Sequence, residues 1–211
     1  MITLKNISKS FGGLKAVQDV SIEIEKGSIT GLIGPNGAGK TTLFNIIAGF
    51  YKADTGSISL NNEDISGLRS DQLFAKGLLR TFQIAHEFDN LSVRENLMMV
   101  PSDQAGENII NTWLFPGKIK KEEKINHDRA SEVMDFLGLY HLRNEKAGIL
   151  SGGQKKLLEL GRTMMVDAKI VLLDEVGAGV NKTLLKKISK SIARLNRERG
   201  YTFFMIEHDI D

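Results

Sequence analysis

Two glycine-rich segments of this chain combine small residues with side chains that suit the binding of anions. The first, IGPNGAGKTT, fits the pattern G-x-x-x-x-G-K-[ST] from Gly34 to Thr41. Glycines let the backbone curve so that its N–H groups point at phosphate oxygens, and the start of a following helix adds partial positive charge. The pattern lies between an apolar strand expected over 28–33 and a helix expected over 40–48, which is the context that a nucleotide-binding loop requires. The sequence therefore predicts a triphosphate site here.

Each polar side chain of this loop has an expected role. Lys40 reaches the β- and γ-phosphates, Thr41 offers its hydroxyl to Mg²⁺, and Thr42 bonds the α-phosphate. The residues expected to bind the nucleotide are Gly34, Pro35, Asn36, Gly37, Ala38, Gly39, Lys40, Thr41 and Thr42.

Carboxylates that complement this loop follow a second apolar strand. The segment IVLLDE ends in Asp174 and Glu175. A buried strand that ends in an acid places Asp174 beside the Mg²⁺ shell, and Glu175 is then placed to polarise the attacking water. His208 follows a third apolar strand, and parallel sheets bind ligands at the carboxyl ends of their strands, so we expect it to orient the γ-phosphate or the water.

The second glycine-rich segment, LSGGQ at 150–154, precedes an amphipathic helix expected to end near Met165. Its N–H groups and the Ser151 hydroxyl form another anion site. One chain needs only one phosphate cradle, so two such elements are explained if each completes the other's site in a dimer. A head-to-tail pair would hold two ATP molecules, each between the Lys40 loop of one chain and Ser151 of the other.

Composition limits the class of protein. The chain has 211 residues, 41% hydrophobic and 26% charged, with a net charge of +2. This charge gives no general attraction to nucleic acid or anionic lipid. The sequence has no cysteine, which excludes disulfides and thiolate metal sites. We find no secretory signal and no apolar run near the roughly 20 residues that a membrane span needs, so we expect any membrane role to act through a partner.

Hydrophobic patterning predicts the elements that position these residues. Alternating apolar residues indicate strands near 2–4, 20–24 and 58–60, and continuous apolar runs indicate buried strands at 170–173 and 201–206. Helices are expected over 70–76, 93–99, 131–139 and 184–199. This order favours a parallel α/β core preceded by antiparallel strands. We interpret 101–130 as an insertion, part loop and part helix, in which Trp113 and Phe115 either fill a small core or form a docking patch.

The chain resembles the ATP-binding cassette (ABC) ATPases over essentially its whole length, through the phosphate loop, LSGGQ, the 170–175 strand and EHD at 207–209. The resemblance implies an α/β P-loop NTPase (RecA-like) core with an N-terminal antiparallel β-subdomain and an α-helical signature subdomain. It further implies that Phe11 stacks on adenine and that Gln83 contacts Mg²⁺ and the water. Asp174, Glu175 and His208 correspond to the Mg²⁺ ligand, the catalytic base and the switch histidine. The signature residues that act across the dimer are Ser151, Gly152, Gly153 and Gln154.

Three features depart from the family pattern. Val176 occupies a position where proline is usual, and Asn181, in the 178–181 loop that crosses the dimer interface, occupies one where aspartate is commoner. The family also continues beyond the position of Asp211, so we expect a C-terminally truncated cassette. The resemblance divides the chain into a core of 1–83 and 156–211 and a helical subdomain of 84–155, which includes the insertion 101–130.

More narrowly, FGGLKAV, LLRTFQ and the long insertion are similar to the ATPases of branched-chain amino acid uptake systems and their urea and amide relatives. This similarity implies an ATP- and Mg²⁺-dependent ATPase at the cytoplasmic face of the cell membrane. Its partners would be integral permease subunits, a second ABC ATPase and, indirectly, a solute-binding protein, and not nucleic acid. The alternative is a soluble ABC ATPase acting in translation or DNA repair. Such proteins usually carry two cassettes, coiled coils or zinc modules, and this chain has none of these signals.

Overall fold

The computed structural model describes all residues except 82–87, 103, 167, 175–176, 178–179 and 208–211. The chain divides into two compact units. The first unit comprises 1–83, 168–178 and 185–211, and the second comprises 84–167 and 179–184. This division differs from the expected one over 156–167 and 179–184. Over the first of these ranges the reason is that the helix that follows Ser151 is continuous to Met165 and packs within the second unit.

The first unit begins with an antiparallel sheet of order β2-β1-β4-β5. Its strands are β1 (Ile2–Phe11), β2 (Leu14–Ile24), β4 (Thr55–Leu60) and β5 (Glu63–Asp64). Two-residue loops connect the hairpins, and three of their residues take the left-handed conformation that such loops favour: φ is 57° at Gly12, 49° at Asn61 and 67° at Asn62. The expected antiparallel strands are confirmed.

A parallel sheet of order β3-β8-β7-β6 forms the rest of the first unit's core. Its strands are β3 (Ile29–Ile33), β6 (Leu78–Arg80), β7 (Ile170–Asp174) and β8 (Thr202–Glu207). Every residue of β7 is buried, as its continuous apolar run predicts. The sequence did not predict β6, because three residues are too few to show a period.

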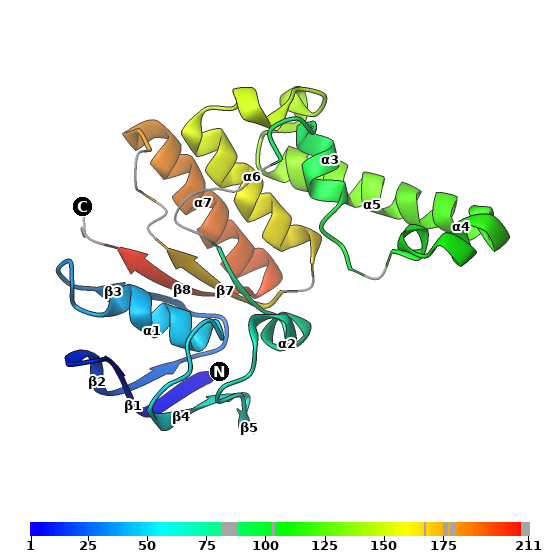
Figure 1. Cartoon of the computed structure of the whole chain (residues 1–211). Helices are drawn as coiled ribbons and strands as arrows, with labels where there is room; N and C mark the ends of the chain where they lie inside the picture. Colours follow the sequence, from blue (N-terminus) through cyan, green and yellow to red (C-terminus); the bar gives the residue numbers. More distant parts are fainter. Residues whose placement is uncertain (82–87, 103, 167, 175–176, 178–179, 208–211) are drawn as a thin grey trace. The chain divides into compact units, whose positions relative to one another are not determined.

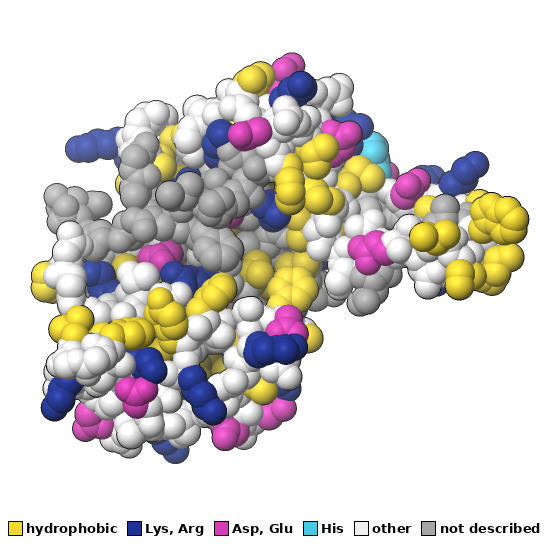
Figure 2. Space-filling model, in the orientation of Figure 1, with side chains coloured by type: hydrophobic (Ala, Val, Ile, Leu, Met, Phe, Trp, Pro, Cys, Tyr) yellow, Lys and Arg dark blue, Asp and Glu magenta, His cyan; other side chains and the backbone are white. Residues whose placement is uncertain are grey.

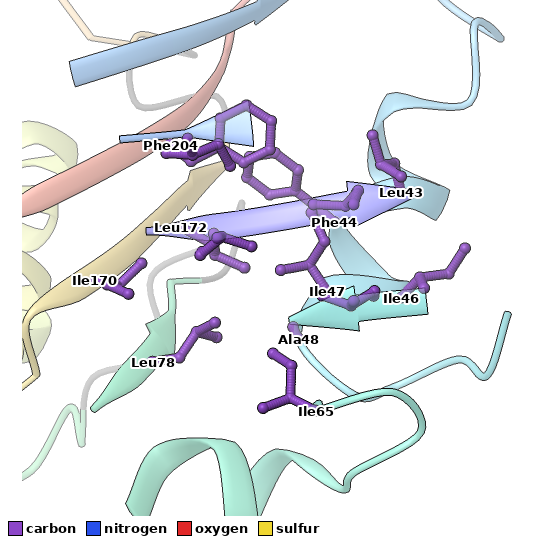
Figure 3. Close-up of a cluster of buried hydrophobic side chains, with 14 of the residues drawn as sticks. Leu43, Phe44, Ile46, Ile47, Ala48, Ile65, Leu78, Ile170, Leu172 and Phe204 are labelled. Atoms are coloured by element: carbon purple, nitrogen blue, oxygen red, sulfur yellow. The ribbon is translucent and has the colours of Figure 1, made fainter. Parts of the chain in front are cut away.

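The main core is built by α1 (Lys40–Ile47) and by buried side chains of both sheets, from β1, β2 and β4 as well as from β6, β7 and β8 (Figures 1 and 3). Phe44 of α1 packs on Phe204 of β8 with ring centroids 4.8 Å apart. Leu172 of β7 joins the same cluster, whereas its neighbour Val171 points to the opposite face, where α7 (Lys182–Arg199) lies in Figure 1. The short helix α2 (Ser70–Ala75) completes this unit, with Leu73 buried. The core therefore holds α1 in place against the sheet, and the phosphate loop connects a strand of this sheet to α1.

The second unit is helical. Its elements are α3 (Val93–Met98), η1 (Ala105–Glu107), α4 (Ile109–Leu114), α5 (Pro116–Phe136), η2 (Tyr140–Leu142), η3 (Ala147–Ile149) and α6 (Gly152–Met165). A Cβ at Gly161 of α6 would lie 3.0–3.1 Å from side-chain atoms of Leu137, Leu97 and Val133, so glycine allows the helices to approach closely. Helix α5 begins at Pro116, inside the insertion, and so starts earlier than the helix expected from residue 131.

Among the residues that the structure describes, no helix has the length and apolar character needed to cross a membrane.

Candidate nucleotide-binding site

The phosphate loop runs from the end of β3 into α1, as the sequence predicts. Gly39 has φ of 83°, and a Cβ there would lie 2.1 Å from the Ala16 carbonyl oxygen of β2. Only glycine satisfies both the backbone angle and this close approach. Gly37 has φ of 82° but open space around it, so its requirement for glycine is conformational alone.

Lys40 is the first residue of α1 and is almost fully buried. Its Nζ donates hydrogen bonds to the carbonyl oxygens of Gly34 (2.7 Å) and Pro35 (2.9 Å). The backbone carbonyl groups of the loop thus hold the Lys40 ammonium group in position. A phosphate oxygen can replace these carbonyl oxygens, since a hydrogen bond between two charged groups is stronger than one to a neutral acceptor.

A hollow of about 420 Å³ adjoins the loop, within the range of small-molecule sites. It is lined by residues 15–18 of β2 and by 37–40 of the loop. Thr41 and Thr42 lie in the first turn of α1, Thr41 exposed and Thr42 half-buried. Helix N–H groups without intrahelical partners are available in this turn, where phosphate binding is favoured.

Asp174 is the last residue of β7, and its carboxylate is only 3% exposed. Its Oδ2 accepts a hydrogen bond at 2.6 Å from an Nη of Arg80, which is the last residue of β6 and 9% exposed. The other Nη of Arg80 donates to Oδ1 of Asn45 on α1, and its guanidinium lies 5.7 Å from the Phe50 ring centroid. This buried ion pair joins two strand ends to α1.

Sequence analysis missed Arg80 and Asn45. The available signal was indirect: a carboxylate on a strand buried on both faces needs a charged or hydrogen-bonding partner. Arg80 is a charged residue at the end of an apolar segment, and the pairing of Arg80 with Leu172 in the parallel sheet brings it close to the end of β7.

The donor set suits a magnesium ion that is bound together with a nucleotide. Among the residues that the structure describes, no group of three or more His, Cys, Asp or Glu is arranged to hold a metal ion by itself. Mg²⁺ usually takes one or two protein oxygens and completes its shell with phosphate and water oxygens. The Asp174 carboxylate and the Thr41 hydroxyl fit that requirement by their chemistry.

Phe11 ends β1 and is 43% exposed. Tyr51 contacts it edge-on with ring centroids 5.3 Å apart, a neighbour that sequence analysis did not identify. The Lys9 ammonium lies 5.6 Å from the Phe11 centroid and also pairs with Asp54 at 2.6 Å. The hydrogen bond from Lys9, together with that from the Ser10 N–H, lowers the pKa of Asp54. An ordered, partly exposed aromatic ring is what base stacking requires.

The signature segment begins α6 with a capping box. Ser151 Oγ accepts from the Gln154 N–H at 3.4 Å, and Gln154 Oε1 accepts from the Ser151 N–H at 2.8 Å. Gly152 is exposed with open space around it, whereas a Cβ at Gly153 would lie 1.9 Å from Leu184 Cδ2. Gly152 therefore leaves backbone accessible, and Gly153 permits close packing.

The same capping chemistry occurs at α3, where no anion site is expected. Ser92 Oγ accepts from the Glu95 N–H at 3.2 Å, and Glu95 Oε2 accepts from the Ser92 N–H at 2.7 Å. The hydrogen bonds that the Glu95 carboxylate accepts from the Ser92 N–H and from the Ser92 hydroxyl lower the pKa of Glu95. Asn181 caps α7 in a related way, because its Oδ1 accepts from the Leu184 N–H at 2.9 Å.

Gln83, Glu175, Val176 and His208, as well as residues 178–179, lie outside the described residues. The strands that precede them are described: β6 ends at Arg80, β7 at Asp174 and β8 at Glu207. These are neighbouring strands of one parallel sheet. The roles of Gln83, Glu175 and His208 stay predictions.

Comparison with known proteins agrees with this description. The family model described as "ABC transporter" matches residues 17–178. A probable branched-chain amino acid transport ATP-binding protein, LivG, of Methanocaldococcus jannaschii is 41% identical over 211 residues, which are 100% of this chain and 81% of that protein. The high-affinity LivG protein of Escherichia coli K12 is 35% identical over 210 residues, 100% of this chain and 82% of that protein.

Solved structures show the same similarity. The crystal structure of the ADP conformation of an ATP-binding cassette of an ABC transporter matches with a TM-score of 0.85 and 41% identity, covering 100% of this chain and 82% of that one. A dimeric ATP-binding cassette in a post-hydrolysis state with ADP and phosphate matches with a TM-score of 0.78 and 27% identity, covering 100% and 89%.

Proposed function

The chain belongs to the ABC transporter family of ATP-binding cassette ATPases, and from this premise we propose that it energises an importer of branched-chain or related amino acids. The nucleotide-binding ATPase fold is that of the family. The solute is inferred from the relatives that are 35–41% identical, which are named as branched-chain amino acid transport proteins. The ATPase subunit is not expected to contact the solute, so the choice of branched-chain amino acids depends on sequence similarity to these relatives alone.

Within this function the residues of the loop hold the nucleotide. Lys40 exchanges its carbonyl partners for the β- and γ-phosphates, and the first turn of α1 binds phosphate oxygens through its N–H groups. Thr41 and Asp174 would hold Mg²⁺, which neutralises phosphate charge when it is bound. Glu175 accepts a proton from the attacking water, a form of help worth roughly 10²–10⁴-fold in rate. Gln83 and His208 orient that water and the γ-phosphate.

The signature segment acts on the nucleotide of a second chain. Ser151, with the exposed backbone of Gly152, would contact the γ-phosphate bound to the Lys40 loop of the partner. ATP then joins the two chains, and loss of the γ-phosphate on hydrolysis releases them. A relative that is a dimer with ADP and phosphate supports this arrangement.

The proposed setting is the cytoplasmic face of the cell membrane. There the chain would bind integral permease subunits and pair with an identical or paralogous ABC ATPase. A solute-binding protein would act upstream without contacting it. One solved relative, described as part of an ABC transporter complex, supports a multi-subunit assembly.

The observation that carries the proposal is the buried Lys40 ammonium held at a glycine-rich helix start beside a strand that ends in Asp174. The test is purification of the tagged protein from its native membranes in mild detergent, reconstitution of the complex, and ATP-driven uptake of radiolabelled leucine. We expect polytopic membrane proteins in stoichiometric amounts and uptake that the Lys40→Ala variant abolishes. Lys26→Ala, which changes an exposed lysine elsewhere, is the control.

Recovery from the cytosol with ribosomal or DNA-repair proteins would contradict the importer assignment. A complex that couples ATP hydrolysis to another solute, with no uptake of branched-chain amino acids, would contradict the solute alone.

A further inference from the structure

Among the described residues of the second unit, the large hydrophobic side chains with the highest exposed fractions lie in the insertion. Helix α4 and the residue after it present five large side chains, which we call the apolar tip: Ile109, Ile110, Trp113, Leu114 and Phe115. Trp113 is 88% and Ile109 is 86% exposed. Hydrophobic side chains gather over α4 at the right-hand end of the space-filling view (Figure 2). The alternative that Trp113 and Phe115 fill a small core is therefore wrong.

Polar contacts outside the apolar tip tie the insertion to neighbouring helices. Glu122 of α5 accepts a hydrogen bond at 2.8 Å from the Ala105 N–H, which ties η1 to α5. Gln104 Nε2 donates to the carbonyl oxygens of Met98 (3.1 Å) and Pro101 (3.0 Å), which ties the start of the insertion to the end of α3. Polar contacts and the buried Ala105 therefore order this segment, and its large apolar side chains remain outside. Large ordered apolar patches of this kind mark interaction surfaces.

Exposed lysines follow the apolar tip along the chain. Residues 108–121 contain no Asp or Glu, and the exposed start of α5 carries what we call the basic run: Lys118, Lys120, Lys121 and Lys124. The acids that flank this stretch are Glu107, Glu122 and Glu123. Glu122 accepts a hydrogen bond from the Ala105 N–H and lies 3.8 Å from Lys118. The combination is an apolar surface beside exposed lysines, which can contact an anionic surface.

This chemistry fits a lipid surface better than a protein surface. Protein interfaces are depleted of lysine and depend on directed hydrogen bonds, which this segment offers few side chains to make. Interfacial membrane helices combine Trp, Phe and Leu on one side with lysines on the other, and tryptophan favours the headgroup level. We propose that the apolar tip inserts into the interfacial layer of an anionic bilayer while the basic run contacts the headgroups. This site is separate from the nucleotide site and does not depend on the identity of the solute.

Trp113 is the only tryptophan of the chain and so reports on its own environment. The experiment adds phosphatidylglycerol–phosphatidylcholine vesicles to the purified full chain, without nucleotide or permease, and records tryptophan emission and vesicle co-flotation. We expect a blue shift and flotation with anionic vesicles, weakening as salt is raised, and far weaker binding to pure phosphatidylcholine. An unchanged spectrum with no flotation would overturn the proposal.

Variants separate the two parts of the surface. Replacing Ile109, Ile110 and Leu114 by serine leaves the reporter in place. We expect partitioning to fall by about 100-fold or more, because each buried CH₂ contributes about fourfold and burial of only three or four of the removed groups already gives this factor. Lysine-to-glutamine changes in the basic run should each cost about fivefold. Ile149→Ser, which changes an exposed apolar residue of η3, is the matched control and should bind as the parent does.

All these positions are exposed, so circular dichroism and thermal unfolding should be unchanged in every variant. Equal losses in the Ile149→Ser control would overturn the assignment of binding to the tip. Unaltered vesicle binding in the triple serine variant, with loss of co-purifying permease, would assign the tip to a protein partner instead.

Discussion

Replacement of Arg80 by methionine tests the buried ion pair at the ends of β6 and β7. Methionine keeps most of the volume but leaves the Asp174 carboxylate, 3% exposed, without its cation, and it leaves Asn45 Oδ1 without its donor. Breaking a buried pair in this way costs about 3–5 kcal/mol, because the remaining charge stays buried. For a chain of this length the expected fall in melting temperature is roughly 6–20 °C.

Two comparisons distinguish the loss of the ion pair from a nonspecific loss of stability. Arg69 and Asp71 form a similar contact at 2.8 Å, but their side chains are 75% and 64% exposed. Arg69→Met should therefore cost no more than about 1 kcal/mol. Adding Asp174→Asn to Arg80→Met removes the uncompensated charge, so we expect the double variant to be more stable than Arg80→Met alone, with a coupling energy of about 2–4 kcal/mol.

The assay is urea and thermal unfolding followed by far-UV circular dichroism, without nucleotide. Tryptophan fluorescence would follow only the second unit, because Trp113 lies there and the ion pair lies in the first. A loss at Arg80→Met no larger than that at Arg69→Met would refute the reasoning, as would additive costs in the double variant.

Three further predictions concern the glycines of the signature segment, the serine that caps its helix, and the proposed catalytic glutamate. Gly153→Ala should destabilise the protein by about 1–3 kcal/mol in urea unfolding because its Cβ meets Leu184, whereas Gly152→Ala, in open space, should be neutral or stabilising by up to about 1 kcal/mol. Ser151→Ala and Ser92→Ala should each lose about 1 kcal/mol of cap energy, but only the former should weaken ATP-dependent dimerisation measured by light scattering; equal effects on the dimer would remove the special role of the signature. Glu175→Gln should retain ATP and accumulate dimer with ATP and Mg²⁺ in gel filtration, and a monomer at high protein concentration would count against the sandwich.

Elements could be predicted from the sequence where hydrophobic residues recur with a regular spacing over many positions or form a continuous apolar run. The β7 strand, the helix that ends at Met165 and the loop around Lys40 are where the patterns placed them. The β6 strand is too short for a period, so neither it nor the role of Arg80 was predicted. The contact between Gly39 and Ala16 joins distant parts of the chain, and no local pattern reveals it. The choice between core and surface for Trp113 depended on whether a neighbouring element covers it, and that is a tertiary property.

The bonds between Lys40 and the carbonyls of Gly34 and Pro35 have a consequence for selectivity. An incoming anion must replace two existing charge-assisted hydrogen bonds, so binding is an exchange in which weak acceptors gain little. A polyphosphate has several charged oxygens that can replace the two carbonyl oxygens at the ammonium group. A nucleoside monophosphate has fewer charged oxygens, so we expect it to bind more weakly. We therefore expect the loop's own carbonyls to make the site favour ligands with several charged oxygens over ligands with few.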